Sequence, residues 1–209
     1  MAEEFQTGPA YSHVAILGAG AWGTALAAIA ARAGRRVTLW GRNGSLLVDI
    51  STGENPRYLP GVELPEDISV TSSLAVAAGG EFVILAAPAQ ATRALLKELV
   101  PLLAPGTPLM LSAKGIEQNS GKLLPEILAE EAPCHPVAIL SGPSFAREVA
   151  SGLPTAVTIA AEAALAARLQ LTLSTPSFRP YASDDVMGVA LGGAAKNVYA
   201  IACGVVEGL

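Results

Sequence analysis

Three glycines near the amino terminus are the residues whose types and spacing carry the clearest chemical meaning. Gly18, Gly20 and Gly23 follow a short apolar run and open an alanine-rich stretch with the composition of a helix. In a GxGxxG turn the first glycine permits a tight bend, the second lets a pyrophosphate approach, and the third lets the helix lie close to the sheet. The helix amino terminus adds N–H groups and a partial positive charge. The spacing therefore predicts a dinucleotide-binding turn.

The next apolar run ends in Arg42 and Asn43, where such a turn is usually followed by an acidic residue that binds the ribose 2′-hydroxyl. No carboxylate stands there to repel a 2′-phosphate, and the Arg42 guanidinium can pair with a phosphate or stack on adenine. We therefore expect NADP(H) as the cofactor, with NAD(H) as the open alternative. The loop that starts at Pro88 also follows an apolar run, and we expect it to border the cofactor.

Two further apolar runs end in residues suited to an anionic ligand. Lys114 follows one run directly, and Gly115 keeps the approach to its ammonium group open. The other run leads into a Gly-Pro-Ser turn, in which Pro143 is expected to preset the start of a helix. There the Gly142 amide and the Ser144 hydroxyl are candidate donors to a substrate. A helix cap is the alternative role for Ser144.

The apolar run at residues 186–208 contains one lysine, Lys196. The run is long enough to cross a bilayer, but a central lysine costs about 3 kcal/mol in lipid, so we expect a helix buried in protein and no membrane span. Apolar surroundings and a neighbouring Lys114 would favour a neutral amine, which can act as a base. A lysine that reaches solvent is the alternative. A narrow helix face is formed by Gly188, Gly192, Gly193, Ala194 and Ala195.

These residues need a framework in which strands and helices alternate. Short apolar runs bounded by turn residues indicate strands at 13–18, 36–41, 68–71, 82–87, 108–112, 137–141, 156–160 and 178–181. Helical patterns lie at 21–33, 90–104, 120–131 and 161–173. The alternation predicts an α/β fold with a Rossmann-like, doubly wound and mostly parallel sheet.

Composition limits the partners of the chain. Of the 209 residues, 51% are hydrophobic and 15% charged, and the net charge is −5, which argues against nucleic acid as a partner. Cys134 and Cys203 stand alone in different contexts, which favours reduced thiols in the cytoplasm over a disulfide framework or a metal site.

Taken together, the motifs resemble the bacterial NAD(P)-dependent glycerol-3-phosphate dehydrogenases, in the family's order over residues 13–209. The segments that carry the resemblance are GAGAWGTALA, LWGRN, NPRYLPG, SAKGIE, SGPSFAREVASGLPTA and GGAAKNVYAIACGVVEGL. The resemblance implies an amino-terminal extension at 1–12, a dinucleotide-binding domain at 13–183 and, at 184–209, the first helix of an all-α substrate domain.

The resemblance also implies an activity and residue roles. Hydride transfer would interconvert glycerol 3-phosphate and dihydroxyacetone phosphate and so supply phospholipid synthesis, with Lys196 as the proton acceptor and Lys114 as a second catalytic residue. Cofactor contacts would fall on Ala21, Trp22, Arg42, Lys114 and Ala146, and substrate contacts on Lys114, Gly142, Ser144 and Lys196. A homodimer stays an open alternative.

Members of this family continue into a longer helical domain that supplies further phosphate-binding residues. We therefore expect a chain of these 209 residues to lack most of that domain and to turn over little substrate. Two alternatives remain at this point. One is a catalytically silent NADP(H)-binding module, and the other is a related two-domain dehydrogenase of the hydroxyacyl-CoA or ketopantoate type.

Overall fold

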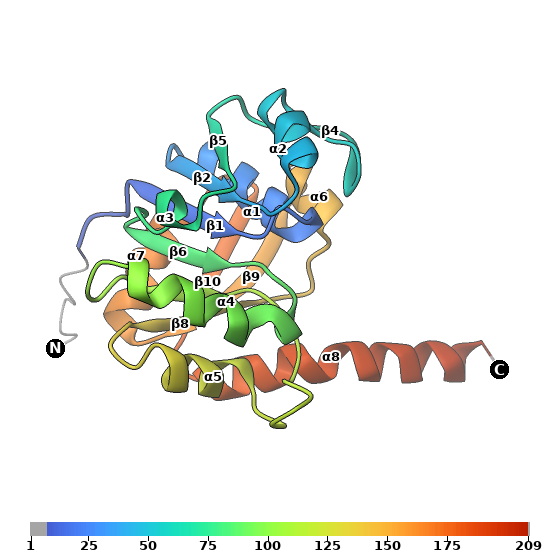
Figure 1. Ribbon diagram of the computed structural model, residues 1–209. Coiled ribbons are helices and arrows are strands. Elements are labelled where there is room, and N and C mark those ends of the chain that lie inside the picture. The colour runs from blue at the N-terminus through green and yellow to red at the C-terminus, as the bar shows by residue number, and fades with distance from the viewer. Residues whose placement is uncertain (1–7, 209) are drawn as a thin grey trace, which may run out of the picture.

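The computed structural model describes residues 8–208, most of them built around one eight-stranded sheet (Figure 1). Residues 1–7 of the expected amino-terminal extension and Leu209 lie outside the described residues. The strand order is β10-β9-β8-β7-β6-β1-β2-β5, and only β8 and β9 pair antiparallel. The mostly parallel α/β sheet predicted from the sequence is confirmed. The strands are β1 (His13–Leu17), β2 (Arg36–Trp40), β5 (Ile68–Thr71), β6 (Phe82–Leu85), β7 (Leu109–Leu111), β8 (Val137–Ser141), β9 (Thr155–Ala161) and β10 (Phe178–Ser183).

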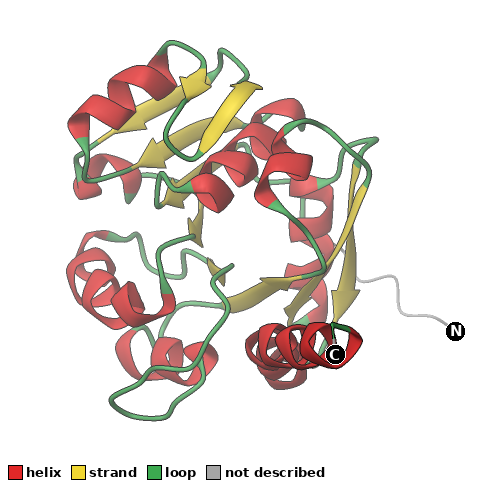
Figure 2. Ribbon diagram, turned by 90° about the vertical axis from the view of Figure 1, so that its right-hand side faces the viewer, coloured by secondary structure: helices red, strands yellow, loops and turns green. Residues whose placement is uncertain are grey.

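Helices cover both faces of this sheet, which Figure 2 shows from the side. One face carries α1 (Ala21–Arg32), α2 (Gly44–Ser51), α6 (Ala146–Ala150) and α7 (Ala163–Leu173). The other carries α3 (Leu74–Ala77), α4 (Thr92–Leu99), α5 (Leu124–Glu131) and the beginning of α8 (Val186–Glu207). Strand β1 shows why its sequence is continuously apolar: Val14 and Ile16 enter one core, and Ala15 and Leu17 enter the other.

Prolines and glycines shorten two of the predicted helices. The pattern at 90–104 becomes α4 between two short 3-10 turns, η1 (Ala89–Ala91) and η2 (Val100–Leu102). Pro101 lies in the second turn and has no N–H for an i to i−4 hydrogen bond, so the α-helix ends before it. The pattern at 120–131 begins as a helix only at Leu124, because Gly121 adopts a positive φ of 70° and Pro125 occupies the first helical turn.

Four short elements were not predicted from the sequence. They are α2, α3 and the separate hairpin of β3 (Glu54–Asn55) and β4 (Leu59–Glu63). The two helices have recognisable amino-terminal caps, because the side chain of Asn43 accepts a hydrogen bond from the Leu46 N–H and that of Ser73 accepts one from the Val76 N–H. These caps were the available sequence signal.

Helix α8 corrects the expectation of a buried helix. Its first turns pack on the sheet, whereas the rest projects from the body of the molecule (Figure 1). By length and composition α8 could cross a membrane, and only 6% of its most apolar window is buried. The sequence pattern identified the helix correctly, but burial depends on neighbours, and within residues 8–208 nothing packs on its far half. Its exposed large apolar residues are Met187, Leu191, Val198, Tyr199, Ile201, Val205 and Val206.

The sheet brings the predicted site residues to one edge. Strand β1 lies between β2 and β6, so the chain order reverses direction there, and the carboxyl ends of β1, β2, β6, β7 and β8 lie at the same edge. Ligands of open α/β sheets bind in the crevice at such a reversal.

Candidate functional site

The glycine-rich turn after β1 is closely packed at two of its three glycines. Gly18 has a φ of 126°, and a side chain there would meet the Ala86 carbonyl group at 2.8 Å. A Cβ on Gly23 would lie 1.8 Å from the Gly18 oxygen. Both positions therefore require glycine for the bend and for the close approach of α1 to the sheet.

Gly20 is open, unlike its two neighbours in the motif. A Cβ built there would meet no atom within 4 Å, so the space above it is free for a ligand. No side chain caps the amino terminus of α1 at Gly20, and the first turn contains no acidic residue. The N–H groups of that turn have no acceptor within the helix. A diphosphate fits this cradle in shape and in charge.

A cleft of about 1240 Å³ opens above this turn, along the carboxyl ends of the strands. Five loops line it, those after β1, β2, β6, β7 and β8, together with the turn between β3 and β4. Of the residues predicted to form the site, Gly18, Gly20, Ala21, Trp22, Arg42, Pro88, Lys114, Ser144 and Ala146 line the cleft. Gly23, Gly142 and Lys196 do not line it.

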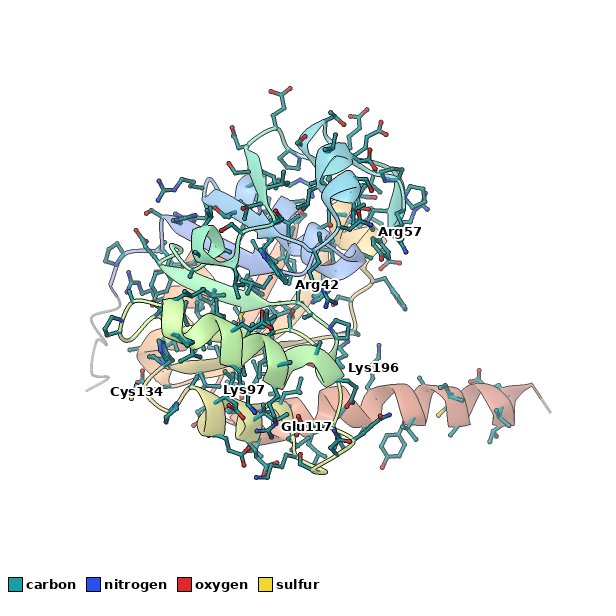
Figure 3. All side chains as sticks on the ribbon, viewed as in Figure 1. Arg42, Arg57, Lys97, Glu117, Cys134 and Lys196 are labelled. Carbon is teal, nitrogen blue, oxygen red and sulfur yellow. The ribbon has the colours of Figure 1, made fainter. Side chains whose placement is uncertain are left out.

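Sequence reasoning missed the contribution of the β3–β4 turn. Arg57 and Tyr58 line the cleft, and Figure 3 shows Arg57 on the same side of the molecule as Arg42. Asn55 fixes this turn: its side-chain amide is fully buried and donates to Thr24 Oγ1 at 2.8 Å and to the Ala19 oxygen at 3.3 Å. The arginine and tyrosine among the turn residues of the NPRYLPG segment were the available signal.

Lys114 joins two of the loops. Its Nζ donates a hydrogen bond of 2.8 Å to the carbonyl oxygen of Gly142, in the loop after β8. Burial lowers the pKa of the Lys114 amine, and the positive charge of Lys196 lowers it further. The two lysines are thus close enough for the charge of one to disfavour the protonated form of Lys114, in line with the neighbouring lysines expected from the sequence.

The Gly-Pro-Ser turn differs from the prediction in one respect. Helix α6 begins at Ala146, with Phe145 at the cap position, so Pro143 lies outside the helix and does not preset its start. The β-region backbone of Phe145 separates the turn from the helix. No side chain caps α6, so the alternative role of Ser144 as a cap is wrong, and Ser144 lines the cleft.

Lys196 reaches this region from α8. Gly193 brings the helix close to β8, because a Cβ there would lie 2.9 Å from the Ser141 hydroxyl, whereas Gly192 has no neighbour within 4 Å. Of the three glycines on the small-residue face, Gly193 is the one that lies against β8. The Lys196 ammonium lies 5.7 Å from the centroid of the exposed Phe145 ring. Lys196 is only partly buried, so the expectation of apolar enclosure is not met within the described residues.

The sheet reversal, the open glycine cradle and the cleft above them define a Rossmann-like α/β protein with its ligand site at the switch point. Two sequence profiles refine this class. The profile of the NAD-dependent glycerol-3-phosphate dehydrogenase N-terminus matches residues 13–167, and that of its C-terminus matches residues 185–209. The chain belongs to the NAD-dependent glycerol-3-phosphate dehydrogenase family.

Individual relatives agree with this assignment. The chain is 56% identical over 200 residues to the NAD(P)+ glycerol-3-phosphate dehydrogenase of a Bradyrhizobium species, covering 95% of this chain and 61% of that protein. A crystal structure of glycerol-3-phosphate dehydrogenase from Coxiella burnetii shares 37% identity at a TM-score of 0.87, covering 95% of this chain and 62% of that one. The chain thus spans about three fifths of the length of these relatives.

A more distant solved structure bears on one of the alternatives. A ketopantoate reductase from Ralstonia eutropha has 19% sequence identity at a TM-score of 0.63, covering 83% of this chain and 57% of that one. This likeness concerns the fold alone.

Proposed function

We propose that the chain binds NADP(H) in the cleft and serves the interconversion of glycerol 3-phosphate and dihydroxyacetone phosphate. The open cradle at Gly20, beneath an uncapped helix amino terminus, is the observation that carries this proposal. Membership of the family supports the choice of reaction. We assign residues 13–183 to cofactor binding and residues 184–209 to the beginning of the substrate-binding part.

Different residues around the cleft would bind different parts of the cofactor. The first turn of α1, with Gly20, Ala21 and Trp22, would hold the pyrophosphate through backbone N–H groups. Pro88 and Ala146 line the cleft farther along the strand ends and would border the nicotinamide half.

Arg42 supports NADP(H) over NAD(H). It lines the cleft at the end of β2, and no carboxylate stands among the cleft-lining residues to repel a 2′-phosphate. Arg57 adds a second cation to the same cleft, which strengthens this preference.

The chemistry requires one hydride donor or acceptor and one group that moves a proton. Bound nicotinamide supplies the hydride, so the protein has to orient the two reactants and handle the hydroxyl proton. We assign proton transfer to Lys196, and substrate binding to Lys114, Gly142 and Ser144. Lys114 suits an anionic substrate because its ammonium lies at the cleft wall, already held in place by the Gly142 carbonyl oxygen.

The proposed reaction also indicates a metabolic role and a cellular compartment. Glycerol 3-phosphate is a precursor of phospholipids, and we place the protein in the cytoplasm. Cys134 and Cys203 stand alone in the sequence, a pattern more typical of a reducing compartment than of a disulfide framework. Homodimer formation stays an open prediction.

Turnover tests the proposal directly. Because the chain spans about three fifths of its relatives, dihydroxyacetone phosphate reduction should be assayed on the 209-residue chain and on a chimera. In the chimera this chain replaces the matching 61% of the Bradyrhizobium relative. We expect substrate-dependent NADPH oxidation by the chimera. A folded chimera that binds NADPH but turns over no substrate would contradict the assigned reaction and favour a silent binding module.

A further inference from the structure

The segment between β7 and α5, residues 112–123, carries Lys114 but has almost no regular structure. Its one regular feature is an isolated bridge between Ile116 and Leu123. Gly115 next to the lysine has a φ of 151°, and a side chain on it would meet the Ala89 methyl group at 2.9 Å. This segment therefore lies directly against the Pro88 loop, and its position sets the position of the Lys114 ammonium.

Gln90 forms the first fastening of this segment. Its side-chain amide donates to the Ile116 carbonyl oxygen at 2.8 Å and accepts from the Gln118 N–H at 3.0 Å. One side chain thus pairs with the backbone on both sides of residue 117, as a neighbouring strand would.

Arg93, three positions after Gln90 and in the first turn of α4, forms the second fastening. Its guanidinium donates from Nε to Glu117 Oε1 at 2.9 Å and from Nη2 to Glu117 Oε2 at 2.8 Å, a two-pronged pair. The Ser120 hydroxyl donates to the same carboxylate at 2.5 Å. The Glu117 side chain is only 9% exposed, and these donors hold its pKa at about 2, so it stays ionised.

The remaining Arg93 nitrogen is tied to α5. Its Nη1 donates to Glu130 at 2.7 Å and to Glu131 at 2.5 Å. Arg93 therefore links α4, α5 and the segment that carries Lys114, and Figure 3 shows Glu117 beside these helices and below Lys196.

We propose that Glu117, clamped by Arg93, is a positioning residue that holds Lys114 against Gly142 at the cleft wall. This inference rests on the proposed function in so far as Lys114 binds substrate. A hydrogen bond of 2.8 Å weakens steeply when its donor moves by about 1 Å, and Glu117 lies only three positions after Lys114. Loss of the clamp should release the Lys114 ammonium from the Gly142 carbonyl oxygen into solvent.

Glu117→Gln tests the clamp, because it removes the charge and keeps the volume of the side chain. Glu131→Gln is the matched control, since it removes another carboxylate from the same arginine, whereas Glu130 also pairs with Lys122 of the segment itself. Arg93→Lys gives a second variant that keeps the charge but loses the two-pronged geometry. All four proteins are used as the full 209-residue chain.

The readout is the acetylation rate of Lys114 as a function of pH, followed by mass spectrometry without cofactor. Lys97, exposed on α4, is the reference amine. In Glu117→Gln we expect the midpoint of Lys114 labelling to move to higher pH, and the rate at the high-pH plateau to rise several-fold. Arg93→Lys should shift the labelling midpoint and the plateau rate of Lys114 in the same direction but by less. The labelling of Lys97 should stay unchanged. Amide hydrogen exchange at Glu117 and Gln118 should also speed up, with the sheet protected as in the wild type.

The proposal would be overturned if the Lys114 labelling profile of Glu117→Gln matched those of the wild type and of Glu131→Gln. If Glu117→Gln does not fold, the test rests on Arg93→Lys. Lys114 labelling in Arg93→Lys that equals that of the wild type would then overturn the proposal. The labelling needs no ligand. Failure of the wild type to bind NADPH would therefore count against the proposed function and leave the clamp standing.

Discussion

The Lys114 ammonium donates a hydrogen bond of 2.8 Å to the carbonyl oxygen of Gly142, joining the loops that follow β7 and β8. Both residues had been predicted as site residues, yet their direct contact was not foreseen. The contact fixes the side chain of Lys114 at the cleft wall, where burial lowers the pKa of its amine and the positive charge of Lys196 lowers it further.

Arg42→Ala should reduce the preference for NADPH over NADH. Loss of a charge-assisted contact with the 2′-phosphate costs about 1.5–3 kcal/mol, or roughly 10- to 150-fold in the affinity ratio. Calorimetric titration with each cofactor measures the ratio. Arg179→Ala on β10, exposed and outside the cleft, is the control. An unchanged ratio in Arg42→Ala would remove Arg42 from cofactor selection.

Asn55→Ala should lower the free energy of unfolding by about 1–3 kcal/mol, because it leaves the buried Ala19 oxygen and Thr24 hydroxyl without the amide donor. Urea denaturation measures this change. Asn119→Ala removes an exposed asparagine and should have little effect. Equal stability of the two variants would show that the Asn55 hydrogen bonds do not hold the β3–β4 turn.

Glu117→Gln should change how stability depends on pH. The pKa of Glu117 is held at about 2, below its ordinary value of 4.5, so the ionised carboxylate stabilises the fold above pH 4.5. That contribution is lost as the pH falls from 4.5 towards 2. The stability difference between wild type and Glu117→Gln should therefore be present at pH 7 and shrink over this interval. A difference that stays constant down to pH 2 would contradict the assignment.

Lys196→Met, made in the chimera that completes the chain, should lower kcat at least about 100-fold, the usual scale for a general acid or base. NADPH affinity should change far less, because Lys196 does not line the cofactor cleft. Steady-state kinetics and calorimetry separate the two effects. Near-normal kcat in the methionine variant would remove Lys196 from proton transfer.

The sequence predicted the sheet well, because its strands are continuous apolar runs and its central turn needs glycine for steric reasons. The strand ends then located Lys114 and Ser144 at the cleft, since loops after parallel strands gather at one edge. Arg57 was missed because its place at the cleft depends on the buried Asn55 contact, which joins residues 31 positions apart. Within the described residues α8 is less buried than expected, because an apolar composition does not say which neighbours cover a helix.

Calorimetric titration of the 209-residue chain with NADPH tests the central claim most directly, with Gly20→Val as the decisive variant. A Cβ at Gly20 meets no protein atom, so the variant should fold with an unchanged melting temperature, while its side chain occupies the space for the pyrophosphate. Gly23→Ala provides the contrast and should destabilise the fold, because its Cβ would lie 1.8 Å from the Gly18 oxygen. We predict saturable one-site binding by the wild type and none by Gly20→Val. A folded wild-type protein that gives no heat at millimolar NADPH, or a Gly20→Val variant that binds as tightly, would contradict the account.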